Sequence, residues 1–312
     1  MVIKIKDVIM KKQSIKIITA LLCLAVVSAG CKNKSGKNES FSFAFITDIH
    51  LQPERNGLNG FLKAIDTLND RNPDFVITGG DLIFDALRQS HGRADSLYDL
   101  YHKTIKSLKM PVYNTMGNHE IYGIYKKSSG ADPNHPYYGE KMFYNHFGDS
   151  YYSFDHNEWK FMIINSVEDT GKDSYIGLID TVQIGWIKSE LEKTNPVTPI
   201  VISTHIPFIT AFTQKYEGTT MASDSNRVVI NGKEVLDMFK GYNLKLVLQG
   251  HLHTIEDIYI DGIHFITGGA VSGSWWKGPH RGSEEGFVLI KVKGNEFEWE
   301  YVDYRWIVNN SL

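Results

Sequence analysis

The sequence predicts an α/β fold for most of this 312-residue chain. Short apolar runs of strand length alternate with longer stretches in which apolar residues recur at helical spacing. Hydrophobic residues make up 42% of the chain and charged residues 22%, as in ordinary globular proteins. These fractions exclude a disordered chain, a coiled-coil rod and a multi-span membrane protein. About 270 residues are enough to bury a sizeable core in one large domain.

The first 30 residues predict an exported protein. Lys11, Lys12 and Lys16 precede an apolar run over 17–30, which is too short to span a membrane and has the length of a signal-peptide core. The run ends in Val-Ser-Ala-Gly before Cys31 and resembles a bacterial lipobox, which implies cleavage before Cys31 and a lipid on its thiol. We therefore expect secretion across the inner membrane and a lipid anchor in the bacterial cell envelope, in the periplasm or at the outer membrane. A plain secretory signal that is cut nearby is the open alternative.

These features divide the chain into a lipoprotein-type signal peptide at 1–30, a polar flexible tether at 31–40 and a single folded domain at 41–312. Beyond residue 30, 28 Lys and Arg stand against 35 Asp and Glu, which gives a net charge of -7. Because nucleic-acid binding depends on cationic contacts to phosphates, we expect none here. Cys23 and Cys31 are the only cysteines, so the folded domain has no thiol for a zinc site, an iron–sulfur cluster, a nucleophile or a disulfide.

The elements of this domain are predicted in order along the chain. The strands are expected at 43–47, 75–78, 112–115, 151–155, 160–165, 199–203 and 244–249, the fourth and fifth forming a hairpin. Helical spacing predicts one helix with Phe61, Ile65 and Leu68, a second with Leu97, Tyr101, Ile105 and Leu108, and a third near 175–193. A loop-rich aromatic segment covers 121–148, and the pattern over about 257–305 predicts strands without a helix.

Five of the predicted strands are each followed by residues that can bind a metal ion. The carboxyl ends of strands form the edge of an α/β sheet where ligands bind, so we expect these side chains to converge. Gly79, Gly80, Gly117 and Gly250 are expected to make the sharp turns that this requires. The candidates are Asp48 and His50, Asp81, Asn118 and His119, His205, and His251 and His253.

The chemistry of this set favours two divalent metal ions. Carboxylate, amide and imidazole ligands without thiolate suit manganese, zinc or iron alike. The ligands are too many for one ion, and two ions that share one carboxylate use them all. Such a pair, about 3.5–4 Å apart, can hold a bridging hydroxide and clamp a phosphoryl group during in-line attack. His119 is left over beside Asn118, where it is placed to protonate the leaving oxygen or to stabilise the transition state.

The order of these motifs resembles the calcineurin-like metallophosphoesterase superfamily. The chain has D-x-H at 48–50, G-D at 80–81, G-N-H-E at 117–120, His205, and G-H-x-H at 250–253. The resemblance implies a two-sheet β-sandwich flanked by helices, a four-layer αββα architecture. It also implies the following roles: Asp48, His50 and His253 hold one metal ion, Asn118, His205 and His251 hold the other, Asp81 bridges them, and His119 is the catalytic histidine.

Two departures from the family's pattern limit which branch of the superfamily this chain can resemble. Purple acid phosphatases have a glycine and a tyrosine where this chain has His50 and Phe84, so a purple acid phosphatase proper is not expected. Phe84 also stands where protein phosphatases have an aspartate that orients the catalytic histidine. Asp85, one residue further on, either takes over that role or is a helix cap or a surface charge. The pattern is typical of the broad phosphodiesterase and phosphatase branch.

Three segments are candidates for contact with a substrate. Trp275 and Trp276 follow a glycine-rich loop, and they form either a stacking platform for a base, a sugar or a lipid headgroup, or an aromatic pair that covers the core. The segments at 121–147 and 206–231 are either lids over the site or insertions that pack on the sheet.

The leading functional hypothesis is hydrolysis of a small organophosphate by a metal-bridging hydroxide, with His119 as acid or transition-state stabiliser. Monoester and diester substrates are both open, and Arg227 and Lys277 are candidate cations for the second charge of a monoester. The metal identity and the oligomeric state are also open. The alternative is a non-catalytic metal-binding or phosphate-binding envelope protein on the same fold. Its signature would be the loss of Asp81, Asn118 or His119, and all three are present.

Overall fold

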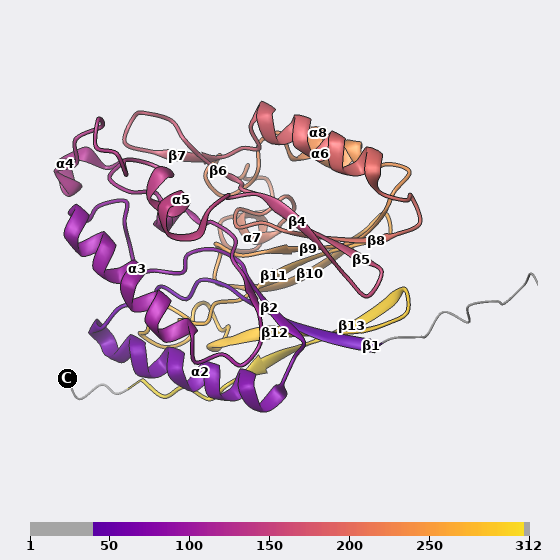
Figure 1. The fold of residues 1–312 in the computed structure, drawn as a ribbon, viewed down its shortest axis with the longest axis horizontal. Coiled ribbons are helices and arrows are strands. Elements are labelled where there is room, and N and C mark those ends of the chain that lie inside the picture. Colours follow the sequence, from indigo (N-terminus) through magenta and orange to yellow (C-terminus); the bar gives the residue numbers. More distant parts are fainter. Residues whose placement is uncertain (1–39, 309–312) are drawn as a thin grey trace, which may run out of the picture. The chain divides into compact units, whose positions relative to one another are not determined.

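The computed structural model describes residues 40–308, which form two mixed β-sheets packed face to face with helices on both outer sides (Figure 1). This confirms the predicted α/β fold with a two-sheet sandwich. The predicted signal peptide at 1–30, the tether up to residue 39 and the lipid-bearing Cys31 lie outside the described residues. Among residues 40–308, no helix has the length and apolarity needed to cross a membrane.

The first sheet has five strands in the order β13-β12-β1-β2-β3. The three strands from the first part of the chain run parallel, and the C-terminal hairpin adds two antiparallel strands at the other edge. The strands are β1 (Ser40–Ile46), β2 (Phe75–Thr78), β3 (Val112–Tyr113), β12 (Gly286–Lys293) and β13 (Glu296–Asp303).

The second sheet has six strands in the order β10-β11-β9-β8-β5-β4. Its four central strands are parallel, and the outer strands β4 and β10 are antiparallel to their neighbours, which confirms the predicted hairpin of β4 and β5. The strands are β4 (Tyr152–His156), β5 (Trp159–Ile163), β8 (Pro199–Ser203), β9 (Asn243–Gln249), β10 (Ile255–Ile260) and β11 (Ile263–Gly268). A separate ribbon pairs β6 (Val167–Asp169) with β7 (Tyr175–Gly177).

Helices cover the outer faces of both sheets: α2 and α3 lie against the first sheet, and α6 and α8 against the second (Figure 1). The longer helices are α2 (Gly57–Arg71), α3 (His91–Ile105) and α6 (Thr181–Lys193). The shorter ones are α4 (Lys126–Ser129), α5 (Lys141–Phe147), α7 (Phe212–Tyr216) and α8 (Gly232–Met238), with 3-10 turns η1 (Glu54–Asn56) and η2 (Asn118–Glu120).

The helix expected near 175–193 begins only at Thr181, so the predicted start was wrong. Residues 175–177 pair as β7 instead. The Asp180 side chain accepts hydrogen bonds from the backbone N–H groups of Val182 and Gln183, which is the favoured arrangement at a helix N-terminus.

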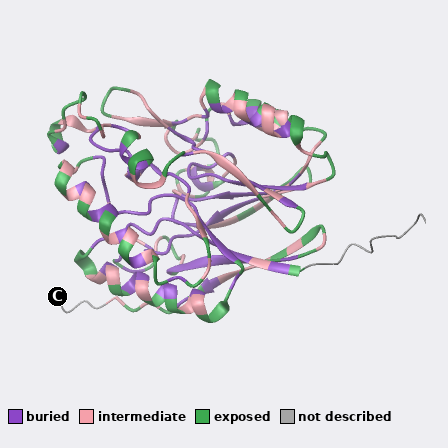
Figure 2. Cartoon of the chain, viewed as in Figure 1, coloured by how far each residue is buried: buried purple, intermediate pink, exposed green. Residues whose placement is uncertain are grey.

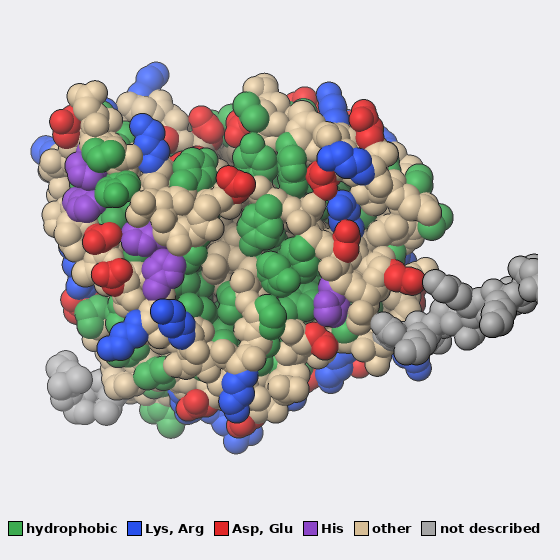
Figure 3. All heavy atoms as spheres, viewed as in Figure 1, with side chains coloured by type: hydrophobic (Ala, Val, Ile, Leu, Met, Phe, Trp, Pro, Cys, Tyr) green, Lys and Arg blue, Asp and Glu red, His purple; other side chains and the backbone are tan. Residues whose placement is uncertain are grey.

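The core follows from the two-residue period of the strands. In β1, Phe43 and Phe45 point between the two sheets, whereas Ala44 and Ile46 point toward the helices. All four are fully buried, and each buried phenylalanine contributes about 1.5–3 kcal/mol relative to an exposed one. Figure 2 shows buried residues along the strands and exposed ones on the outer surfaces of the helices. On the face shown in Figure 3, hydrophobic side chains gather at the middle, with acidic and basic side chains intermixed around them.

Candidate metal centre

The structure brings the predicted ligands together at the carboxyl ends of β1, β2, β3, β8 and β9. Within each of three groups, the possible ligand atoms lie within 4.8 Å of one another. The Asn118 amide oxygen joins them, 3.0 Å from Nε2 of His205. The groups are Asp48 with His50 and His253, Asp81 with His205 and His251, and His50 with Asp81 and His119.

The cluster has two halves, and Asp81 faces both. In one half, Nε2 of His253 lies 3.0 Å from Nε2 of His50 and 3.2 Å from Oδ1 of Asp48. In the other half, Nε2 of His205 lies 3.2 Å from Oδ1 of Asp81. The second oxygen of Asp81, Oδ2, lies 3.6 Å from Nε2 of His50. One carboxylate therefore presents one oxygen to each half, as a shared ligand of two ions would.

Backbone carbonyls hold the outer nitrogens of two histidines. Nδ1 of His205 donates to the Gly79 carbonyl at 2.7 Å, and Nδ1 of His253 donates to the Gly273 carbonyl at 2.6 Å. The hydrogen on Nδ1 leaves the lone pair of Nε2 to point into the cluster, as in metal-binding histidines. Among residues 40–308, no Lys or Arg nitrogen lies within ion-pair distance of Asp48 or Asp81. The donor set therefore fits divalent cations.

The charges of the cluster also suit cations. Burial raises the pKa of Asp81, but His205 and His119 outweigh it and hold the pKa of this carboxyl well below its usual range. Burial, together with His205, lowers the pKa of His251 to about 3, so this imidazole is neutral. Burial lowers the pKa of His205, but Asp81 outweighs it and raises the pKa to about 9. A cation therefore has to displace a proton from His205, and binding will weaken as the pH falls.

The ligand residues themselves make the turns that were assigned to glycine. Of the four glycines, only Gly80 has a positive φ, of 88°. Such backbone conformations cost about 1–3 kcal/mol each for residues with side chains, and they gather at functional sites. The surrounding fold must supply that energy. The ligand candidates with positive φ are Asp48 (53°), His50 (44°), Asp81 (52°), His251 (72°) and His253 (54°).

Two of these glycines have another role: without a side chain, their backbone can approach the neighbouring strand ends closely. A Cβ atom on Gly117 would collide with the backbone nitrogen and Oδ1 of Asp81. A Cβ on Gly250 would collide with Oγ1 of Thr47 and approach Oδ2 of Asp48 to 2.8 Å. Each glycine thus lets one strand end lie directly against the carboxylate of another.

Glu120 is a structural residue of the site that the sequence analysis missed. This carboxylate is fully buried and accepts backbone N–H groups from Asp81 at 2.9 Å, Leu82 at 2.8 Å, Ile83 at 3.2 Å and Gly117 at 2.7 Å. It therefore ties the loop after β2 to the loop after β3. Its position after His119 in the G-N-H-E motif was the available signal.

His119 lies at the edge of the cluster and is held by a backbone carbonyl. Its Nδ1 donates to the Phe84 carbonyl at 2.5 Å, and its Nε2 faces Asp81, 3.8 Å from Oδ2. Asp85 lies 3.8 Å from Nδ1, which is beyond hydrogen-bond reach, and accepts the backbone N–H of Leu87 at 3.0 Å. Phe84 thus supplies, through its carbonyl, the orienting contact that was sought in the side chain of Asp85.

The two tryptophans have different environments. Trp276 is 1% exposed, and its indole Nε1 donates to the His50 carbonyl at 3.0 Å. Its ring is therefore part of the core, and the expectation that it stacks on a substrate is wrong. Trp275 is partly exposed, with its ring centre 4.4 Å from that of His253 and 5.6 Å from that of His50. Of the two tryptophans, Trp275 is the one whose ring lies beside the candidate ligands and reaches the surface.

The other segments considered for substrate contact are folded parts of the structure. The segment at 121–147 contains α4 and α5 and buries Met142 and Phe143. Arg227, in the segment at 206–231, was a candidate cation for the second charge of a monoester. It forms ion pairs with Glu217 and Asp224, so its charge is already compensated.

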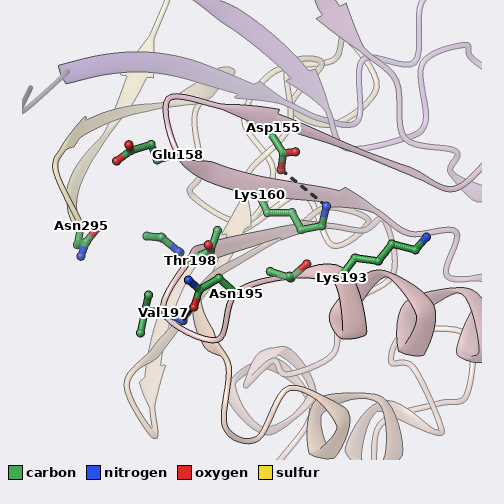
Figure 4. A pocket seen from close by; sticks show the side chains of 10 residues that line it. Asp155, Glu158, Lys160, Lys193, Asn195, Val197, Thr198 and Asn295 are labelled. Carbon is green, nitrogen blue, oxygen red and sulfur yellow. Dashed lines mark hydrogen bonds and ion pairs between the residues drawn. The ribbon is translucent and has the colours of Figure 1, made fainter. Parts of the chain in front are cut away.

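A pocket of about 630 Å³ lies at the opposite end of β8, between the β4–β5 turn, the β12–β13 turn and the start of β8 (Figure 4). Figure 4 shows Lys160 directed toward Asp155, and Lys160 also lies 3.3 Å from Glu190. None of the predicted ligands lines this pocket.

The comparisons with known proteins agree with this geometry. The model of the calcineurin-like phosphoesterase family matches residues 41–254. The fold is similar to a dimetal phosphatase from Danio rerio, with 14% identity, 85% of this chain and 99% of that chain covered, and a TM-score of 0.58. It is also similar to GAP50, the anchor in the inner membrane complex of Plasmodium, with 15% identity, 85% of each chain covered and a TM-score of 0.51. No curated protein matches the sequence significantly. The chain belongs to the calcineurin-like phosphoesterase family and is a metal-dependent phosphoester hydrolase.

Proposed function

We propose that this protein hydrolyses a phosphoester bond of a small organophosphate with two divalent metal ions. Asp48, His50 and His253 would hold one ion, Asn118, His205 and His251 would hold the other, and Asp81 would be shared. The observation that carries the proposal is the arrangement of Asp81, whose two oxygens face the two halves of one cluster at 3.2 and 3.6 Å. When bound, two such ions would provide a water of lowered pKa as nucleophile and neutralise the phosphoryl oxygens.

The protein's own residues would position the ligands and move one proton. In the neutral form of each imidazole, the carbonyls of Gly79 and Gly273 would hold the hydrogen on Nδ1 of His205 and His253 and so direct the lone pair of Nε2 into the cluster. The Phe84 carbonyl keeps the hydrogen on Nδ1 of His119 and directs Nε2 inward. In its protonated form, His119 would donate the Nε2 proton to the leaving oxygen, a contribution of about 10²–10⁴-fold to the rate. No side-chain nucleophile is needed, so attack by water would be direct.

The experiment uses the full-length chain, purified in detergent. It is stripped of metal with a chelator and reloaded with Mn²⁺, Zn²⁺ or Fe²⁺. Hydrolysis of an aryl phosphate monoester and of the matching bis-aryl diester is then measured, with Asp81→Asn as the control. Activity that returns with metal and is absent in the variant supports the proposal, and the better substrate decides between monoester and diester. A protein that binds two metal ions and hydrolyses neither would support the alternative, a non-catalytic binding protein.

We further propose that the protein is exported and anchored by a lipid on Cys31. Support comes from the sequence alone, in the apolar run over 17–30 and the small residues before the cysteine. Expression in a bacterial host with radiolabelled palmitate would test this, with Cys31→Ala as the control. Label that depends on Cys31 is the expected result. An unlabelled protein that is processed and exported would indicate a plain secretory signal instead.

A further inference from the structure

Arg88 lies between the Tyr125 ring and Asp85, close to His119. Its guanidinium carbon is 4.1 Å from the centre of the Tyr125 ring, a cation–π distance. Its Nη1 is 3.9 Å from Oδ1 of Asp85, the same oxygen that lies 3.8 Å from Nδ1 of His119. Nε2 of His119 faces Asp81, so the carboxylate of Asp85 lies on the Nδ1 side of this imidazole, with the Arg88 guanidinium next to that carboxylate.

Arg55 lies beside Phe84. Its Nη1 donates to the Trp275 carbonyl at 3.2 Å, and its guanidinium carbon is 5.9 Å from the centre of the Phe84 ring. Because the Trp275 ring packs beside His253, this contact places Arg55 next to the first half of the cluster. Arg55 therefore lies beside Phe84, the residue whose carbonyl holds His119, and Arg88 lies beside Asp85, the next residue in the chain.

The charges of both arginines are available to a ligand. Among residues 40–308, no carboxylate lies within 4.0 Å of the Arg55 guanidinium. Arg88 has only Asp85, at a distance too long for a hydrogen bond. Arg227 differs in this respect, because it is paired with Glu217 and Asp224. An arginine without a carboxylate partner and a second one with a single carboxylate at 3.9 Å, both beside a phosphoesterase site, favour an anion there, because arginine binds carboxylate and phosphate through paired hydrogen bonds.

We propose that Arg55 and Arg88 bind a second anionic group of the substrate, on the leaving group and outside the phosphoryl group that is cleaved. This inference rests on the proposed function and names its substrate class, an organophosphate whose leaving group carries a carboxylate or a further phosphate. The place of Arg88 carries the assignment, because it adjoins Asp85, which lies on the Nδ1 side of His119, and His119 is the proposed proton donor to the leaving group.

Two substrates of equal shape test the proposal, 4-carboxyphenyl phosphate and 4-carbamoylphenyl phosphate. They differ in one negative charge on the leaving group. The ratio of their kcat/KM values is measured by phosphate release from the full-length, Mn²⁺-loaded protein. We expect the wild type to favour the carboxylate through a lower KM. Arg88→Gln and Arg55→Gln are each expected to reduce that ratio roughly three- to tenfold, the range for exposed charge-assisted contacts.

Two further variants separate charge from folding. Arg88→Lys keeps a positive charge and should retain part of the preference, and Arg227→Gln removes a compensated arginine and should leave the ratio unchanged. The wild-type preference should also fall as salt is added. An equal loss on both substrates in Arg88→Gln would place the arginine on the cleaved phosphoryl group and overturn the proposal. A wild-type ratio that does not respond to either arginine would overturn it as well.

A binding measurement separates this proposal from the proposed function. Calorimetry with 4-carboxyphenylphosphonate and 4-carbamoylphenylphosphonate needs no turnover. Tighter binding of the carboxylate that depends on Arg55 and Arg88, without hydrolysis of either phosphate, would support the anion site and reject the enzyme. Hydrolysis without any such difference in binding would reject the anion site and leave the enzyme in place.

Discussion

β8 begins at Pro199, in the wall of the pocket of Figure 4, and ends at Ser203, two residues before His205 in the metal centre. Both ends of this strand hold acidic groups. Beside the pocket, Glu190 lies 2.9 Å from Lys193 and 3.3 Å from Lys160, two lysines that line it. In the metal centre, the carboxylate of Asp81 has only histidines as ion-pair partners among residues 40–308. Carboxylates that are already paired with ammonium groups have no charge left for a metal ion. The comparison shows that the kind of neighbour, histidine rather than lysine, identifies the site better than the size of a hollow does.

The backbone conformation also differs between the two ends of β8, the pocket and the metal centre. Near the pocket, the residues with positive φ are Asn157 and Glu158, which form the two-residue turn of the β4–β5 hairpin. Positive φ at both central residues is the ordinary requirement of such a turn. In the metal centre, the same conformation occurs at aspartates and histidines that close no hairpin. Local turn chemistry explains the first case, and only the convergence of ligands explains the second.

The largest expected difference is between two variants, one at each end of β8. The first removes a candidate metal ligand, and the second removes a carboxylate of the pocket. His205→Gln should lower kcat/KM by more than about 100-fold, because even outer partners of metal ligands cost 10–100-fold. Asp155→Asn, in the pocket, should leave kcat/KM unchanged. Steady-state kinetics and the metal content of both purified variants check this. A pocket variant that lost activity equally would refute the contrast.

His119→Gln separates catalysis from metal binding within the metal centre. We expect kcat to fall by about 10²–10⁴-fold, because the proton donor is lost, while the bound metal stays at the wild-type level. Elemental analysis beside the kinetics provides the measurement. Loss of one metal ion in this variant would instead make His119 a ligand.

Adding a methyl group at a glycine tests how closely the strand ends pack in the metal centre. Gly117→Ala should lower the free energy of unfolding by about 1–3 kcal/mol, because the new Cβ collides with Asp81. Gly92→Ala is the matched control, since nothing lies within 4 Å of a Cβ at this position in α3. That variant should be more stable than the wild type, by up to about 1 kcal/mol. Urea denaturation of both measures the difference, and equal stability of the two variants would contradict the close-approach argument.

The smallest expected effect is on the stability of the fold near the pocket, and it depends on pH. A hydrogen bond from Ser153, and contacts with Lys193 and Lys160, lower the pKa of Glu190 to about 2, although partial burial opposes the shift. A depressed carboxyl pKa stabilises the fold above the usual value of about 4.5, and this stability is lost as the pH falls toward 2. Glu190→Gln should therefore be less stable than the wild type at pH 7, and the two should converge near pH 2. Urea midpoints of metal-free protein at several pH values check this. A difference that does not shrink with acid would mean that the ion pairs are not its source.

Most strands, and the meeting of the candidate ligands at the strand ends, could be predicted from local sequence. β2 and β8 have the predicted bounds, because four or five consecutive buried residues between polar ends can form little else. The ligands could be predicted because Asp, Asn and His follow directly on such strands. The start of α6 was misplaced, because the pairing of β6 with β7 is a contact across several residues that apolar spacing does not encode.

By itself, the sequence determined the α/β class, the order of the strands along the chain and the residue types that end them, since these depend on neighbours a few positions apart. Tertiary structure alone decided which strands join which sheet, that Trp276 is buried and that Trp275 lies at the site. It also decided that the Phe84 carbonyl, rather than the side chain of Asp85, holds His119. The physical reason is that each of these outcomes depends on groups that are distant in sequence or on backbone atoms that every residue shares, and neither leaves a mark in local composition.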